Sequence, residues 1–592
     1  MIDLIEQGLN KSQILAIDTP GSVFLAACPG SGKTRTLAFK IATALTKLET
    51  SKKLIVAITY THRAADEILE RIEALGLDTS LLWIGTIHSF CLEWILRPYA
   101  IYEPRLESGF IIINQPDAES ILDEICSTIS DQRITAYDCN YHFKDEKVTL
   151  LCHDVTKHAN IKKVLKEYFA VLKENRQIDF ELILYFANKL LCSYPAISRA
   201  LSEIFDLIAL DEYQDTKFIQ YSILFSIYKS GNGKTKAFVV GDPNQAIFES
   251  LGGYAIDYAE FQKRSGLKVT ELSLQENYRA SQCLVNYYSN FEVTKTTTTA
   301  KGDYKNYKSR IVWDKAVTAN QLEDRICSLI DFCLHDLGCP EEEICIVGPQ
   351  WPSLAALTRR LMSKRPDYRY NGPGMIPFGR ELDNFWYKLS RICLSEPAPD
   401  MYIRRIRWAT EVLADLSDAG CDCSLSSKEL LREMNQVTSD ESNGMKYLEH
   451  YFSAFLQNVG IKDITSYPDL DQHYKSFFES SQKKIAKAKK DGLDLIENID
   501  FFKRAFKPRS GITISTIHGI KGAEFENVIS FSLLEGLVPH WAAKHSVDSA
   551  NKLLYVICSR AKKNLFLISE SKPHKKPTNV LSSITYPYTT GI

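Results

Sequence analysis

The eight-residue stretch ACPGSGKT, residues 27–34, constrains the fold more than any other part of the chain. It follows the apolar run of residues 23–26 and precedes LAFKIATAL, a segment with a helical pattern. A glycine-rich loop between a strand and a helix turns its backbone N–H groups inward at the helix N-terminus, where they can surround phosphate oxygens. Gly30 and Gly32 keep the backbone free where phosphates must approach. The stretch therefore predicts a P-loop, with a nucleotide as its ligand.

Two positions of this loop have separate expected roles. Lys33 is expected to reach the β- and γ-phosphates, and Thr34 is expected to ligate Mg²⁺. Ala27 stands where the general pattern has glycine, which is a mild departure. The residues predicted to bind the nucleotide in this stretch are Ala27, Cys28, Pro29, Gly30, Ser31, Gly32, Lys33, Thr34 and Arg35.

Composition limits the class of protein. The chain has 592 residues, which suggests about four domain-sized units. Its net charge of −2 means that any nucleic-acid path must be a local basic track rather than a property of the whole chain. The 15 cysteines show no paired C-x-x-C framework and are expected to be reduced and buried. The N-terminus is polar and no apolar run has the length of a membrane span, so we expect a cytoplasmic protein.

Gln13 lies just before the first predicted strand. Its side-chain amide offers one donor and one acceptor, and adenine is the base that matches both. The alternative is a surface glutamine on an N-terminal helix. Gln13 is therefore a candidate for contact with the nucleotide base.

Polar residues also follow two further predicted strands. Residues 54–72 are expected to form a buried strand followed by an amphipathic helix. Thr59, Thr61 and Arg63 lie at the end of that strand. The stretch WIGTIHSF, residues 83–90, ends a short strand with Thr86 and His88. Ligands bind at such strand ends in parallel sheets. For His88 we expect no proton chemistry, because a histidine at this position is more often structural.

The stretch FDLIALDEYQDT, residues 205–216, is an apolar strand that ends in adjacent carboxylates. In a chain with a P-loop, Asp211 fits a residue that holds Mg²⁺ through water, and Glu212 fits a residue that positions and deprotonates the attacking water. Without the P-loop the pair would be a helix cap. The strand of KAFVVGDPNQAIF, residues 236–248, places Gln245 where its amide can report on the γ-phosphate.

The order of these stretches resembles the UvrD/Rep/PcrA family of superfamily 1A DNA helicases. LSLQENYRAS, residues 272–281, is similar to motif IV of that family, GITISTIHGIKGAEFENV, residues 511–528, to motif V, and LLYVICSRAKKNL, residues 553–565, to motif VI. The resemblance implies ATP as cofactor and arginine fingers at Arg279 and Arg560, with Arg279 reaching the γ-phosphate from the second motor domain. It also implies contacts of Glu524 with the nucleotide sugar. The residues expected to bind DNA are Thr59, Thr61, Arg63, Thr86, His88, Phe248, His518 and Lys521.

The resemblance further implies an α/β fold with two RecA-like parallel-sheet motor domains and mostly helical insertions. We expect domain 1A at residues 1–95 and 196–280, insertion 1B at 96–195, domain 2A at 281–385 and 506–592, and insertion 2B at 386–505. We expect residues 415–450 to be loop-rich. The basic run KKIAKAKK, residues 483–490, is either a solvated helix face or a contact for duplex DNA or a partner.

Two functions remain open. The first is an ATP-dependent helicase that moves 3′ to 5′ on single-stranded or tailed double-stranded DNA. The second is a DNA-stimulated ATPase that regulates a partner and unwinds little. Ser250 and Leu251 stand where the family has a base-stacking aromatic residue and an arginine, and this departure favours the second function. Short proteins of this kind resemble the helicase-like subunit of Gabija-type anti-phage systems, whose partner is an OLD-like nuclease.

Overall fold

The computed structural model describes residues 8–48, 50, 52–144, 146–379, 384–421, 423–490, 493–506, 511–541, 543 and 545–590. The chain forms two compact units. The first unit consists of Met1–Ser309 and Val538–Lys563, and the second of Arg310–Leu537 and Asn564–Ile592.

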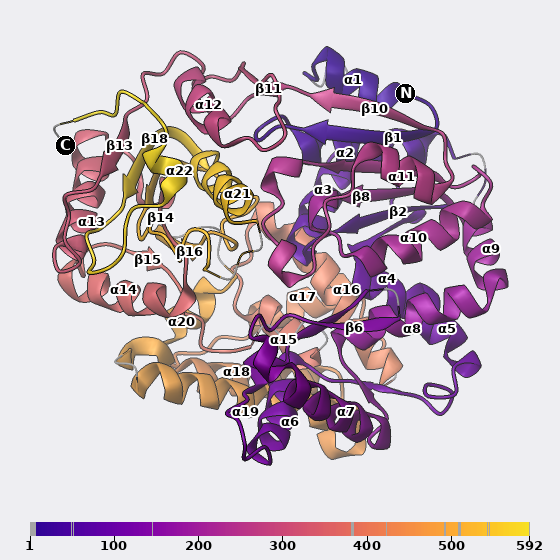
Figure 1. Ribbon diagram of the computed structural model, residues 1–592. Coiled ribbons are helices and arrows are strands. Elements are labelled where there is room, and N and C mark those ends of the chain that lie inside the picture. Colours follow the sequence, from indigo (N-terminus) through magenta and orange to yellow (C-terminus); the bar gives the residue numbers. More distant parts are fainter. Residues whose placement is uncertain are drawn as a thin grey trace. The chain divides into compact units, whose positions relative to one another are not determined.

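The first unit is built on a six-stranded parallel sheet (Figure 1). Its four central strands read as nearly continuous apolar runs because helices cover both faces of such a sheet. In spatial order they are β10 (Val269–Leu274), β1 (Ser22–Ala27), β9 (Lys236–Gly241), β8 (Phe205–Asp211), β2 (Leu54–Thr59) and β3 (Leu82–Thr86).

Side chains along these strands alternate between two cores. Val23 and Leu25 of β1 belong to one core with helices α1 (Lys11–Asp18), α2 (Lys33–Thr46) and α3 (His62–Glu73). Phe24, between them, belongs to the other core with helices α10 (Phe218–Ser230) and α11 (Tyr258–Ser265). Burial on both faces fixes the register of the strands, and therefore fixes which polar residues stand at their ends.

The expected helical insertion after β3 is present in the first unit, together with two small two-stranded sheets. Its main helices are α6 (Gln115–Ser127), α7 (His158–Glu174), α8 (Phe180–Ser193) and α9 (Pro195–Ile204). The small sheets pair β4 (Ile111–Ile112) with β7 (Gln177–Ile178) and β5 (Tyr141–Lys144) with β6 (Lys147–Leu150). The unit is completed by β11 (Glu276–Asn277), α12 (Gln282–Tyr288), β12 (Thr299–Ala300) and α21 (Ser546–Cys558).

The second unit has its own six-stranded sheet, flanked by α13 (Leu322–Asp331) and α14 (Trp351–Lys364). β14 runs parallel to both β16 and β17, and β13 runs parallel to β18. The strand order is β13 (Ile311–Asp314), β18 (Ala561–Ile568), β17 (Phe525–Ser530), β14 (Ile344–Gly348), β16 (Ile512–Thr516) and β15 (Tyr370–Asn371).

A helical insertion separates β15 from β16 in the sequence. Its helices are α15 (Phe385–Cys393), α16 (Tyr402–Asp418), α17 (Ser427–Gln436), α18 (Gly444–Asn458), α19 (Pro468–Lys490) and α20 (Ile499–Arg504). The expectation that residues 415–450 are loop-rich is wrong, because α17 and the first half of α18 lie there, although Asp422 is outside the described residues. The Ser426–Glu429 capping box starts α17, and Leu430 and Met434 bury its apolar face.

The fold is therefore α/β, with two RecA-like parallel-sheet units that carry mostly helical insertions, as the sequence predicts. The four-part boundaries given above stay a prediction, and the two compact units divide the chain at other residues. Among the described residues, no helix has the length and apolar character needed to cross a membrane. All 15 cysteines are free thiols, and most of them are buried.

Candidate active site

The predicted P-loop connects β1 to α2 in the first unit. Gly30 and Gly32 have φ angles of 67° and 79°, in the left-handed region that favours glycine. A Cβ atom on Gly30 would lie 2.6 Å from Cβ of Arg279, and one on Gly32 would lie 2.6 Å from Nε2 of Gln13. Both glycines are therefore required by backbone conformation and by close packing. The loop delivers the N-terminus of α2, with Lys33 as its first residue, to the end of β1.

Gln13 is buried and lies against this loop. Its Nε2 atom donates to the carbonyl oxygen of Ser31 at 2.9 Å, and its Oε1 atom accepts from the backbone N–H of Asn10 at 2.9 Å. The alternative of a surface glutamine is thereby ruled out, while the contact of Gln13 with a base stays a prediction. Tyr278 lies beside it, because Nδ2 of Asn10 donates to the Tyr278 hydroxyl at 2.9 Å. The half-exposed Tyr278 ring has a face that can stack on a base, and we missed it in the sequence.

The paired carboxylates stand at the end of β8. Asp211 is buried, and its Oδ1 atom accepts the backbone N–H of Glu212 at 3.0 Å. Burial, followed by the neighbouring Glu212 charge, raises the pKa of Asp211 to about 7, while the Lys33 charge opposes this rise. Glu212 has a left-handed backbone with φ of 51°, which is unusual for a residue with a side chain.

A chain of hydrogen bonds starts at the end of β9. Nε2 of Gln245 donates to Oδ2 of the buried Asp242 at 2.7 Å, and Nη2 of Arg560 donates to Oε1 of Gln245 at 3.0 Å. Burial raises the pKa of Asp242, and the Lys33 charge again acts in the opposite direction. Arg560, which follows α21, thus reaches the strand end that carries Gln245.

Arg279 is also held beside the P-loop. Tyr278 donates its backbone N–H to the carbonyl oxygen of Gly30 at 2.8 Å, and Asn277 donates its Nδ2 to that of Pro29 at 2.6 Å. Nη1 of Arg279 donates to the carbonyl oxygen of Ser559 at 2.9 Å. We expected Arg279 to act from the second motor domain, but it belongs to the first unit, as does Arg560. The reason is that Asn277 and Tyr278 are hydrogen-bonded to the loop itself, which places the next residue, Arg279, beside it.

The polar residues after β2 and β3 differ in exposure. Thr59 and Thr86 are buried, with Thr59 donating to the carbonyl oxygen of Thr61 at 2.9 Å and Thr86 capping the helix that follows. Thr61 caps α3 and is exposed, and so is Arg63. Thr61 and Arg63 are therefore the exposed two of these four, and the DNA contacts of all four stay predictions.

Two aromatic contacts lie near these strand ends. Tyr60, at the end of β2, packs on Phe248 with ring centroids 5.1 Å apart, and the Tyr60 side chain is 46% exposed. We missed Tyr60 in the sequence, although an aromatic residue between two predicted site residues was a usable signal. His88 packs edge-on against Phe180. Burial, with smaller effects of the Lys217 and His62 charges, lowers the pKa of His88 to about 4, so the ring is neutral near pH 7, and its role stays a prediction.

The remaining predicted site residues belong to the second unit. His518, Lys521 and Glu524 lie in the turn between β16 and β17. Their roles at DNA and at the nucleotide sugar stay predictions. The basic run at residues 483–490 forms the exposed end of α19, with Ile485 buried beneath it. Both alternatives for that run stay open.

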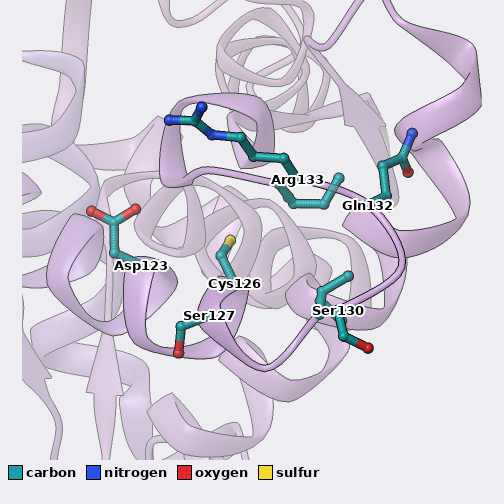
Figure 2. Close-up of a pocket in the computed structure, with 8 residues that line it drawn as sticks. Asp123, Cys126, Ser127, Ser130, Gln132 and Arg133 are labelled. Atoms are coloured by element: carbon teal, nitrogen blue, oxygen red, sulfur yellow. The ribbon is translucent and has the colours of Figure 1, made fainter.

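A surface cavity of about 460 Å³ lies in the first unit, away from these residues (Figure 2). Asp123, Cys126 and Ser127 of α6 line one side, and Ser130, Gln132 and Arg133 of the following loop line the other. None of the predicted site residues lines this cavity. It is therefore separate from the site at the sheet edge.

The fold and the site together define a P-loop nucleotide hydrolase with two RecA-like units. The model of the UvrD/REP helicase N-terminal domain matches residues 9–265, and the model of the UvrD-like helicase C-terminal domain matches residues 470–572. Together these matches cover more than half of the chain. The chain therefore belongs to the UvrD/Rep/PcrA family of superfamily 1A helicases.

Similarity to individual relatives extends along nearly the whole chain. The chain is 23% identical to the ATP-dependent DNA helicase PcrA of Staphylococcus epidermidis over 627 residues, which cover 96% of this chain and 84% of that protein. It is also 23% identical to PcrA of Bacillus subtilis over 628 residues, with 95% and 82% covered. The corresponding values for PcrA of Staphylococcus aureus are 22% identity over 624 residues, with 94% and 83% covered.

Proposed function

We propose that this ATP-dependent DNA helicase couples ATP hydrolysis to movement on single-stranded DNA in the 3′ to 5′ direction. One observation supports the coupling: the P-loop, the paired acids and Gln245 follow β1, β8 and β9 of one parallel sheet, and the Tyr60–Phe248 pair lies beyond β2 and β9 of the same sheet. The carboxyl ends of parallel strands meet at one edge. Nucleotide chemistry and an aromatic surface for bases therefore share that edge.

The nucleotide would bind with Mg²⁺. Thr34 and Asp211 offer the oxygen ligands that this ion prefers, and Mg²⁺ in nucleotide enzymes takes one or two carboxylates together with substrate phosphates. A cation would also stabilise the charged form of the buried Asp211 carboxyl, whose pKa is raised to about 7. The residues therefore fit the ion, which neutralises charge that develops on the transferred phosphoryl group.

Different residues of the chain have different roles in phosphoryl transfer. Lys33 binds the β- and γ-phosphates, and Glu212 positions and deprotonates the attacking water. Arg279 and Arg560 supply planar cations that stabilise the transition state. Gln245 is hydrogen-bonded to Arg560, so it can transmit the state of the γ-phosphate to the strand end that also carries Phe248.

A second function is favoured by the turn after Phe248. Ser250 and Leu251 are exposed there, and Leu251 is 49% exposed. Nζ of Lys552 lies 3.8 Å from Oε2 of Glu249, the residue before them. Neither Ser250 nor Leu251 offers an aromatic face or a cation to DNA. In this second function the protein is a DNA-stimulated ATPase that regulates a partner, for which an OLD-like nuclease of an anti-phage system is our candidate.

Two assays test these functions. DNA-stimulated ATP turnover is measured first, with wild type and with the Tyr60→Ala variant, which we expect to lose stimulation at low DNA concentration but not basal turnover. Unwinding is then compared on 3′-tailed and 5′-tailed duplexes. Unwinding of the 3′-tailed duplex alone supports the motor, strong ATP turnover with little unwinding supports the regulator, and ATP turnover without DNA stimulation contradicts both.

A further inference from the structure

Gln214 bridges two strand ends of the first unit. It is 1% exposed and lies in the short turn after β8. Its Nε2 atom donates to Oε2 of Glu212, and its Oε1 atom accepts the backbone N–H of Asp242 at 3.0 Å. One side chain thus joins the predicted water-activating carboxylate to the residue that follows β9.

The partners define which way the amide points. A carboxylate accepts hydrogen bonds only, and a backbone N–H donates only. The nitrogen of Gln214 must therefore face Glu212, and its oxygen must face Asp242. A glutamate or a methionine at this position would lose the donor, and a methionine would lose the strong acceptor as well.

The surroundings are shaped for this contact. A Cβ atom on Gly241 would lie 2.2 Å from Oε1 of Gln214, so a side chain there would displace the amide. Glu212 has a left-handed backbone with φ of 51°, a conformation that persists in a residue with a side chain where neighbouring groups hold it. The amide of Gln214 is one of the groups that hold it.

The bridge continues to the arginine finger. Asp242 accepts from Gln245 through its side chain, and Gln245 accepts from Arg560. Glu212 and Arg560 are therefore ends of one hydrogen-bonded chain that passes through Gln214 and Asp242. A movement of Gln245 or Arg560 on nucleotide binding would reach Glu212 along this chain.

We propose that Gln214 is a positioning residue for ATP hydrolysis, which holds the Glu212 carboxylate in place for the attacking water and links it to the Asp242–Gln245–Arg560 chain. The inference rests on the proposed role of Glu212. Gln214 touches neither nucleotide nor water in this role, so it should affect turnover and leave nucleotide affinity unchanged.

The test compares Gln214→Met, Gln214→Glu and a control, Gln220→Glu. Gln220 is a buried glutamine of α10 whose Oε1 atom accepts the Lys217 N–H at 2.8 Å, a contact that a glutamate keeps. Basal and DNA-stimulated kcat, KM for ATP and the Kd of a fluorescent ATP analogue are measured for each. We expect kcat of both Gln214 variants to fall by roughly 10²-fold, as for a misplaced catalytic group, with Kd unchanged.

The pH profile separates positioning from general structural damage. A protonated glutamic acid has an O–H donor and a C=O acceptor, like the amide. The kcat of Gln214→Glu relative to wild type should therefore recover as pH falls, while that of Gln214→Met should stay low at every pH. If Gln214→Met does not fold, Gln214→Glu carries the test alone through this recovery.

Two results would overturn the proposal. One is a kcat within about threefold of wild type in the Gln214 variants, and the other is a kcat of Gln214→Glu relative to wild type that does not change with pH. This test can be made on basal ATP turnover, without DNA, and is therefore distinct from the test of the proposed function. A wild type that hydrolyses ATP without responding to DNA refutes the motor, and the Gln214 comparison can still be made on the basal rate.

Discussion

Arg560 donates a hydrogen bond of 3.0 Å to the side-chain oxygen of Gln245, a residue 315 positions earlier in the sequence. The Arg560 side chain is 1% exposed, so its charge depends on such partners. Nε of Arg560 also donates to the carbonyl oxygen of Val556, and Nη2 donates to Oγ of Ser559. Gln245, Val556 and Ser559 are therefore among the neighbours that hold the arginine in place.

This placement predicts the behaviour of Arg560→Ala and Arg279→Ala. Both variants should still bind ATP but hydrolyse it more slowly by about 10³-fold, because an arginine finger acts on charge in the transition state. Stopped-flow binding of a fluorescent ATP analogue and steady-state turnover measure the two properties separately. Arg71→Ala is the matched control, since Arg71 is an exposed residue of α3 paired with Glu67. Greatly weakened binding with normal turnover at saturating ATP would contradict finger roles.

Lys33 and Glu212 should have different effects when they are replaced. Lys33→Ala removes the cation that binds the phosphates, so we expect weaker ATP binding and loss of turnover. Glu212→Gln keeps the size of the side chain and removes the base, so ATP should bind and turnover should fall by about 10²-fold or more. Turnover within about tenfold of wild type in both variants would refute the site, provided that thermal unfolding shows both to be folded.

Local chemistry explains why the edge of the first sheet could be predicted from the sequence. The apolar runs that end at Ala27, Asp211 and Gly241 are buried on both faces, and burial fixes both their length and the residues that follow them. Each predicted strand end is therefore found within a residue or two of its expected position.

Other features could not be predicted, because they depend on contacts between distant segments. Gln214 reads as one polar residue among several in DEYQDT, and only the packing of β8 beside β9 brings it to Asp242. Arg405 stands in the sequence close to Arg404 and Arg407, yet it is buried and its Nη2 atom donates to Oδ1 of Asn435 at 2.7 Å. Burial of a charged side chain leaves no mark in the local sequence when its partners are remote.

The exposed turn at Ser250 and Leu251 predicts a gain of function. The double variant Ser250→Trp, Leu251→Arg should bind single-stranded DNA more tightly, since base stacking on an aromatic side chain contributes about 1–3 kcal/mol. The contribution of the arginine should shrink as salt rises, because it comes from phosphate contacts. DNA affinity and the unwound fraction of a 3′-tailed duplex are measured across salt concentrations, with Ser250→Ala as control. Efficient single-turnover unwinding of long duplexes by wild type would contradict the expectation that wild type binds single-stranded DNA weakly at this turn.

The neutral, partly buried His88 predicts a loss of stability in acid. Its pKa is lowered from 6.5 to about 4, so between these values the unfolded chain binds a proton that the folded chain does not. Stability contributed by the neutral ring is therefore present above pH 6.5 and is lost as pH falls towards 4. From the size of the shift we expect a loss of about 2 kcal/mol between about pH 7.5 and about pH 5. The His88→Gln variant lacks this titrating group. The difference in free energy of unfolding between wild type and His88→Gln should therefore be smaller at the lower pH than at the higher pH by that amount.

Urea unfolding at the two pH values measures this narrowing, through the transition in which the first unit unfolds. His153→Gln serves as control, because it removes a histidine that is exposed. The Lys217 charge contributes to the low pKa of His88, so Lys217→Met should raise that pKa and reduce the acid sensitivity. A difference between wild type and His88→Gln that is the same at both pH values would show that His88 is not held neutral by the fold.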